Sequence, residues 1–351
     1  MKGEVKERRV YLEKLRVITM FLVVYAHCCG VALSQYRESA LQSWKAVVLF
    51  TLRNMCFSSV PIFFMISGSL FLNPKYELRL DRFLKKHVLK YVSVAVIFGW
   101  AYALMDMVFS NRTGGFSLSM IWDSFLNMLQ GETATHMWYM YELVGVMLFL
   151  PAVKAIVNGC EKRTQYYLGL VFFIFMICIP MLNKVLDSEI AFQIPLSSVY
   201  VLYMLIGHWL SEAVLKKKKA VIVISVLVIL ASFGSSIYDA YRTIFQDLDP
   251  IWNKGYSPVV FFRAIAIFLL FRLCFDKKNK VYSVCKFLSP YSFGVYLIHV
   301  LWIQIIVRFV HINPFEGIFV LKILLLWGAA LVLSVLSCMI MKKIPLVKKL
   351  V

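Results

Sequence analysis

An arginine and a histidine share one face of the first apolar segment of the chain. Arg16 and His27 lie eleven residues apart within YLEKLRVITMFLVVYAHCCG, residues 11–30. In an α-helix, eleven steps return to within about 20° of the starting direction, and the two side chains stand roughly 16 Å apart along the axis. A neutral imidazole can accept a proton from a hydroxyl, because its ordinary pKa lies near neutral pH. The pair therefore fits an elongated ligand that is anionic at one end and reactive at the other.

Further ionisable side chains fall at a depth similar to that of His27 in other apolar segments. Arg53, Glu142 and Arg263 lie near the outer ends of their segments, and His136 lies at the mouth of one of them. Such residues are costly inside a membrane, at about 2.5–3.5 kcal/mol each at its centre, and usually face a cavity or a partner. We expect a polar chamber in which His27 is the general base and Glu142 is its carboxylate partner. Arg53 or Arg263 would stabilise an oxyanion.

Less specific interpretations of these residues stay open. Arg16 fits a boundary residue whose guanidinium reaches water, and His27 fits a histidine that is satisfied within a helical bundle. A relay in a transporter would use the same residue types. His299 shares a helix face with Tyr296 through their three-residue spacing, which suits packing as well as a site.

The segments that carry these residues have the length of membrane-spanning helices. Of the 351 residues, 61% are hydrophobic and 16% are charged, whereas soluble domains carry about 25% charged residues. We expect an all-α membrane protein, a bundle of about ten transmembrane helices that forms one domain over residues 1–351, with no separate soluble domain. The expected spans are residues 12–32, 47–72, 85–109, 136–157, 165–182, 194–213, 219–236, 257–275, 289–310 and 317–341.

The net charge of +19 reflects membrane orientation. The basic residues form short blocks between the apolar segments, as the positive-inside rule requires, which argues against nucleic acid as a partner. Most of them fall in the connections on one side, so we expect both termini in the cytoplasm and a multi-pass protein in a bacterial cell membrane. The first apolar segment is too long for a signal-peptide core and is expected to remain as a span. No C-x-x-C or H-E-x-x-H spacing supports a metal site.

Five stretches, in order along the chain, resemble the acyltransferase-3 family of integral membrane acyltransferases. LRVITMFLVVYAH is similar to the arginine-to-histidine signature that opens the family, and RNMCFSSVPIFFMISGSLFL is similar to its second span. RFLKKHVLKYV resembles the basic entry to the third span, HMWYMYELVGVMLFLP the fourth span, and LSPYSFGVYLIHVLW the penultimate span. The resemblance covers essentially the whole chain.

The resemblance implies an activity and roles for residues. Members of the family transfer an acyl group, most often acetyl, from cytoplasmic acyl-CoA to a hydroxyl of an extracytoplasmic or lipid-linked carbohydrate. Acetyl-CoA would be the donor, with no metal. Its phosphates would bind Arg16 and a basic cluster, which we define as Arg82, Lys85, Lys86 and Lys90, because such side chains suit phosphate. The acceptor would contact Arg263, His136, Trp138, Tyr139 and His299.

The chain departs from the family pattern at several points. Lys86, His87 and Lys90 stand where relatives often repeat arginine, which weakens the case for bidentate phosphate binding. Glu142 occupies a position where many relatives carry a small residue. We expect no esterase-like domain of the kind that some members carry, so any transfer to a second enzyme would involve another chain. A transporter or exporter of a small polar solute or glycan is the alternative function, and a non-catalytic assembly subunit is a third.

Overall fold

All the regular secondary structure among the residues that the structure describes is helical. The computed structural model describes residues 9–40, 43–110, 117–186, 190, 198–253, 257–310, 312–345 and 347–350, the side chains of residues 39 and 110 excepted. No β-strand occurs in these ranges. The α-helices are α1 (Val10–Gln35), α2 (Arg37–Ala40), α3 (Trp44–Cys56), α4 (Ser59–Phe71), α5 (Leu80–Phe83), α6 (Leu89–Ser110), α7 (Ser119–Leu129), α8 (Trp138–Gly159), α9 (Lys162–Phe173), α10 (Ile179–Leu186), α11 (Val199–Glu212), α12 (Lys218–Phe245), α13 (Pro258–Cys274), α14 (Lys280–Leu288), α15 (Ser292–Val310) and α16 (Phe319–Met341).

Within the described part of the chain, eight helical stretches are long and apolar enough to cross a membrane, which confirms a multi-pass helical membrane protein. They are Val10–Gln35, Trp44–Phe71, Leu80–Phe109, Thr135–Gly159, Lys162–Leu186, Lys218–Phe245, Lys280–Val310 and Phe319–Met341. Several combine consecutive elements, such as α3 with α4 and α9 with α10.

The other two expected spans are occupied by shorter helices. Helix α11 has 14 residues and α13 has 17, and at about 1.5 Å per residue they are roughly 21 and 25 Å long, against about 30 Å of hydrocarbon. Both are packed among other helices: α11 lies against α4, α8, α9 and α13, while α13 lies against α1, α4, α11 and α12. Residues 194–197 of the expected span 194–213 lie outside the described residues.

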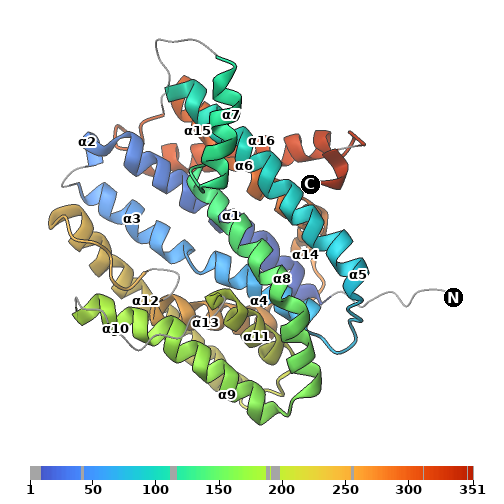
Figure 1. Cartoon of the computed structure of the whole chain (residues 1–351). Coiled ribbons are helices and arrows are strands. Elements are labelled where there is room, and N and C mark those ends of the chain that lie inside the picture. Colours follow the sequence, from blue (N-terminus) through green and yellow to red (C-terminus); the bar gives the residue numbers. More distant parts are fainter. Residues whose placement is uncertain are drawn as a thin grey trace.

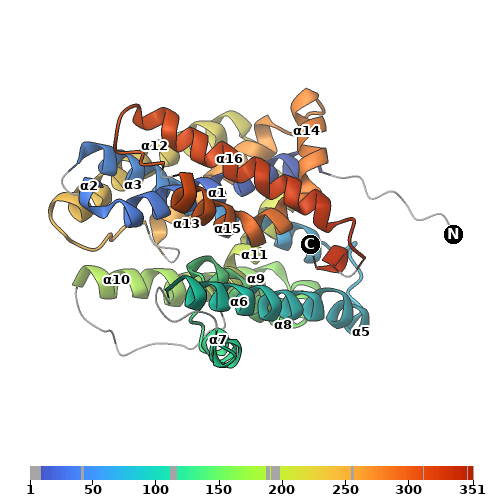
Figure 2. The ribbon, with the colours of Figure 1, turned by 90° about the horizontal axis from the view of Figure 1, so that it is seen from above.

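The helices form two layers. In Figure 2, α6 to α10 form one layer, α1, α12 and α16 lie in the other, and α11 lies between them; Figure 1 looks onto the layer of α6 to α10. Helix α1 contacts α3, α4, α13, α14, α15 and α16. The residues of the first apolar segment are therefore surrounded by protein over much of their length.

A break between α3 and α4 follows from Pro61. A proline has no N–H to donate to the carbonyl four residues earlier, and its ring clashes with that carbonyl. The carbonyl concerned belongs to Phe57, and α3 ends at Cys56 while α4 begins at Ser59. The break places Arg53 in the last turn of α3, where a cation is favoured by the helix dipole.

Helices α4 and α11 cross at a pair of glycines. A Cβ atom added to Gly68 would lie 2.0 Å from the carbonyl oxygen of Met204, and one added to Gly207 would lie 2.1 Å from that of Met65. Close backbone approach through small residues is a common way for helices to pack in membranes. The Ser69 hydroxyl also donates a hydrogen bond across the crossing to the carbonyl oxygen of Gly207 (2.8 Å).

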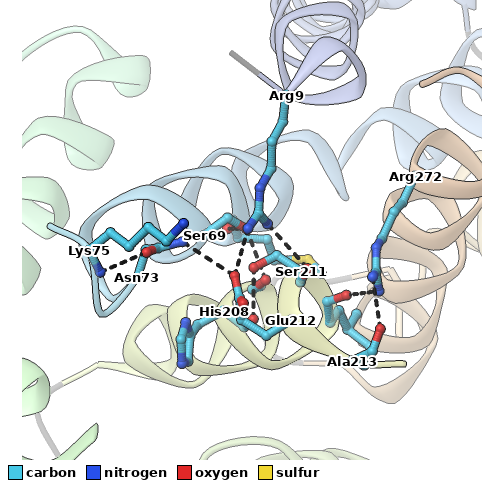
Figure 3. Close-up of polar contacts among 12 residues, drawn as sticks. Arg9, Ser69, Asn73, Lys75, His208, Ser211, Glu212, Ala213 and Arg272 are labelled. Atoms are coloured by element: carbon cyan, nitrogen blue, oxygen red, sulfur yellow. Dashed lines mark hydrogen bonds and ion pairs between the residues drawn. The ribbon is translucent and has the colours of Figure 1, made fainter. Parts of the chain in front are cut away.

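Arginines satisfy the carbonyl groups at the end of α11. The last four carbonyls of a helix have no partner within the helix and need one when they are buried. Arg272 donates to the carbonyl oxygens of Leu210 and Ala213, and Arg9 donates to that of Ser211 (3.2 Å) (Figure 3). Arg9 also forms an ion pair of 2.6 Å with Glu212. These contacts provide partners for the last carbonyl groups of α11, a short helix whose end carries the exposed Glu212.

Candidate active site

A cavity of about 660 Å³ opens beside the second half of α1. Its walls come from α1, α3, α4, α8, α11 and α15, and from the segment that precedes α13. Five of the residues singled out from the sequence lie on it, namely His27, Arg53, His136, Trp138 and Tyr139. The other lining residues are Val23, Ala26, Gly30, Val31, Ser34, Phe50, Asn54, Cys56, Phe57, Val60, Thr135, Tyr200, Pro250, Asn253 and Tyr296. The structure thus brings together groups from five of the expected spans.

Three histidines from different elements lie together at this cavity, two of them, His27 and His136, on its wall. The ring centre of His27 on α1 lies 6.0 Å from that of His136 and 5.0 Å from that of His299 on α15. The His136 and His299 ring centres are 5.4 Å apart. His136 lies on the 3-10 turn Thr135–Met137, which leads into α8. Neither ring nitrogen of His136 has a hydrogen-bond partner among the described residues, although the side chain is buried.

Arg53 brings a positive charge to the same wall. A Cβ atom added to Gly30, three residues beyond His27 on α1, would lie 3.5 Å from Arg53 Nε. The guanidinium carbon is 5.7 Å from the ring centre of Phe50 and 5.4 Å from that of Phe57. Aromatic faces attract a cation through their quadrupole without neutralising it. Arg53 can therefore direct its charge at an anion that forms in the cavity.

Arg263 lies behind the cavity wall and supports it. It is fully buried and donates to the carbonyl oxygen of Asn54 (2.7 Å) and to Oδ1 of Asn253 (3.1 Å), both of which are lining residues. The Asn253 amide in turn donates to the buried carboxylate of Asp239 (2.8 Å). The network joins α3, α12 and α13 to the segment before α13. Its geometry suits wall support, and Arg263 itself is not a lining residue.

Glu142 faces a different hollow. Its carboxylate accepts a hydrogen bond from the Ser198 hydroxyl (2.8 Å). The hollow, of about 440 Å³, is lined by Trp138, Tyr141, Glu142, Gly145, Val146 and Ser198. Trp138 lines both spaces and stands between them. Glu142 is thus not among the residues that surround His27.

Arg16 and His27 both meet α15, at two levels. Nη1 of Arg16 lies 3.5 Å from the hydroxyl of Ser289, in the 3-10 turn before α15, while His27 meets His299 ten residues later. Helices α1 and α15 therefore run in the same direction, as expected for the first and ninth spans. Tyr296 lies on α15 between these two levels and lines the cavity.

The basic cluster is divided by the structure. Arg82, Lys85 and Lys86 are exposed. Lys90 is half-buried, and its ammonium lies 5.2 Å from the ring centre of Phe293, at the start of α15 near Ser289. Lys90 and Arg16 thus approach the same end of α15.

Lys342 joins this end of α15 without having been singled out from the sequence. It donates to the carbonyl oxygen of Pro290 (2.8 Å), and its ammonium lies 4.2 Å from the ring centre of Tyr291. Partial burial lowers the pKa of the Lys342 ammonium. From the sequence, a lysine just after the last span fits a topology signal as well as a binding residue, so its position alone did not indicate a role at the site. Tyr200 and Asn253 in the cavity were also missed, because an aromatic residue in a span and an amide in a loop carry no signal of their own.

The helical membrane architecture and the polar cavity within it agree with the comparison with known proteins. The family model for an acyltransferase domain, that of the acyltransferase-3 family, matches residues 9–343. The chain belongs to this family of membrane acyltransferases, and it is an enzyme that transfers acyl groups other than amino-acyl groups. No curated protein and no solved structure shows a significant match to the chain.

Proposed function

We propose that the protein is a membrane O-acyltransferase, with acetyl the preferred group. It moves the acyl group from cytoplasmic acetyl-CoA to a hydroxyl of a cell-envelope or lipid-linked carbohydrate. The observation that carries the proposal is the joint position of His27 and Arg53 on one cavity, with Arg16 about eleven residues away on the same helix. A base, a cation and a distant anion-binding residue are what transfer from a long, phosphorylated thioester requires.

In the proposed reaction, the neutral His27 imidazole removes the proton of the acceptor hydroxyl as the oxygen attacks the thioester carbonyl. The C–O bond forms, and negative charge develops on the carbonyl oxygen. The Arg53 guanidinium stabilises that charge. The tetrahedral intermediate then breaks its C–S bond, and the leaving thiolate takes the proton from His27. Ester and free thiol are the products, and the base returns to its starting form.

The donor would enter from the end where Arg16, Lys90 and Lys342 approach the start of α15. Its phosphates would bind these cations, and its thin arm would follow α1 toward His27. Tyr139 and Tyr296, whose ring centres are 4.9 Å apart, lie on the cavity wall along this direction. The arm must pass them, so the proposal expects these side chains to move when the donor binds.

This route requires the orientation inferred from the positive-inside rule. Both termini and the basic cluster would be cytoplasmic, and the histidines would lie in the outer half of the membrane. The acceptor would then approach from the opposite side to the donor, past Trp138 and His136. An aromatic side chain beside a polar group suits a sugar, because its face packs on the apolar side of the ring.

Labelled acetyl-CoA provides the direct test. Purified protein in lipid nanodiscs is incubated with it and with an envelope extract, and mass spectrometry identifies the molecule that gains the acetyl mass. We expect a carbohydrate to be labelled by the wild type and not by His27→Ala. His208→Gln is the matched control, because His208 lies near the end of α11 and does not line the cavity.

Three results would contradict the proposal. Equal labelling by His27→Ala would remove His27 as the base. Solute uptake or efflux in proteoliposomes without acyl-CoA, together with an absence of acyl transfer, would favour the transporter alternative. Stable co-purification with another protein and neither activity would favour an assembly subunit.

A further inference from the structure

His299 lies behind the two histidines that face the cavity. It is fully buried and is not one of the lining residues, whereas His27 and His136 both are. The rings next to His299 that do line the cavity are those of His27, His136 and Tyr296, whose centres lie 5.0, 5.4 and 5.9 Å from its own. Direct contact with the acceptor, which the sequence had suggested for His299, is therefore less favoured than an action through a neighbouring imidazole.

The backbone determines which nitrogen of His299 carries hydrogen. Nδ1 lies 2.7 Å from the carbonyl oxygen of Tyr296 and 3.1 Å from that of Val295. A carbonyl oxygen only accepts hydrogen bonds, so Nδ1 must be the donor. In the neutral ring, Nε2 is then left with a lone pair. Nε2 is buried and has no partner among the described residues, which is unusual for a buried polar atom and costs free energy.

The distances favour His27 as the donor that this lone pair lacks. Each imidazole nitrogen lies about 1.1 Å from its ring centre, so the 5.0 Å separation of His27 and His299 allows a nitrogen–nitrogen distance of about 2.8 Å, an ordinary hydrogen-bond length. For His136, at 5.4 Å, the corresponding limit is about 3.2 Å. The His27 and His299 rings are tilted by 58° and no hydrogen bond joins them in the positions described, so the pairing requires rotation about the broad terminal side-chain torsion of His27.

We propose that His299 orients the base: its Nε2 accepts a hydrogen bond from His27 and fixes the tautomer that catalysis needs. This inference rests on the proposed function. With one nitrogen of His27 donating to His299, the other keeps its lone pair for the acceptor hydroxyl. After His27 takes the hydroxyl proton, its second N–H still donates to His299, and the proton leaves with the thiolate. His299 gains and loses no proton, so it is a positioning residue.

Two substitutions at one position separate orientation from packing. His299→Phe keeps the ring shape and removes the acceptor, whereas His299→Gln offers an amide oxygen in a similar place. Transfer from labelled acetyl-CoA to envelope extract is measured per folded molecule, at a fixed amount of extract. We expect kcat of His299→Phe to fall about 10- to 100-fold with little change in the KM for acetyl-CoA, and His299→Gln to recover part of the loss.

Several results would overturn the inference. One is a kcat of His299→Phe equal to that of the wild type. Another is a kcat of His299→Gln as low as that of His299→Phe. The double variant with His136→Phe tests which histidine His299 pairs with. If His299 pairs with His136, adding His299→Phe to His136→Phe lowers kcat no further. If His299 pairs with His27, adding His299→Phe still lowers kcat. If the wild type transfers no acyl group, the proposed function fails together with the inference. If transfer depends on His27 and not on His299, the inference alone fails.

Discussion

The crossing of α4 and α11 gives a prediction whose magnitude follows from the structure. In Gly207→Ala, the new Cβ atom would lie 2.1 Å from the carbonyl oxygen and 2.4 Å from the Cα atom of Met65. Backbone atoms cannot rotate away, so the helices must separate by about 1 Å to reach ordinary contact. Overpacking of this kind costs about 1–3 kcal/mol.

Two smaller terms modify this cost. Separation stretches the hydrogen bond of 2.8 Å from Ser69 to the Gly207 carbonyl, which is worth about 0.5–1.5 kcal/mol. The higher helix propensity of alanine returns about 1 kcal/mol. We therefore expect Gly207→Ala to destabilise the protein by about 2 kcal/mol. Gly68→Ala should cost a similar amount. The double variant should cost less than the sum, because one separation relieves both clashes.

Thermal unfolding in detergent or nanodiscs measures the effect, together with acetyl transfer per folded molecule. Gly234→Ala and Gly328→Ala are matched controls, since a Cβ atom at either would meet nothing within 4 Å; they should leave stability unchanged or increase it. Activity should also fall in Gly207→Ala, because α11 carries Tyr200 on the cavity wall. Wild-type stability and activity in Gly207→Ala would show that α4 and α11 do not approach as closely as described.

Three further predictions concern the cavity and the donor entrance. Arg53→Met should lower kcat about 10²- to 10³-fold, as loss of an oxyanion-stabilising group does, and an unchanged kcat in transfer assays would remove that role. Arg263→Met should lower the unfolding temperature, because the carbonyl of Asn54 loses its donor at a cost of about 1–3 kcal/mol, and kcat per folded molecule should be retained. A lower kcat at an unchanged unfolding temperature would place Arg263 on the substrate. Lys90→Glu and Lys342→Glu should each raise the KM for acetyl-CoA on the order of tenfold at low salt and less at high salt. An increase in KM that is the same at low and high salt would argue against a role for the charge of these lysines.

Much of the architecture could be predicted from local sequence. Apolar segments long enough to cross a bilayer predict helices, because only a helix or a closed barrel satisfies the hydrogen bonds of the backbone in the hydrocarbon region. Helical periodicity likewise placed Arg16 and His27 on one face; His27 meets α15, and Arg16 meets the turn that precedes it. The lengths of α11 and α13 could not be predicted in this way, since a short buried helix and a full membrane span have the same apolar composition.

The lateral arrangement was decided only by the tertiary structure. A sequence indicates how deep a residue lies along its own helix, and Glu142 and Arg263 were placed near His27 on that basis. Depth does not determine the direction of a side chain around the bundle axis: Glu142 bonds to Ser198 in a separate hollow, and Arg263 supports the wall from behind. The neighbours of His27 come from α3, the turn before α8, and α15. Their meeting depends on packing between helices far apart in the chain, which no local pattern encodes.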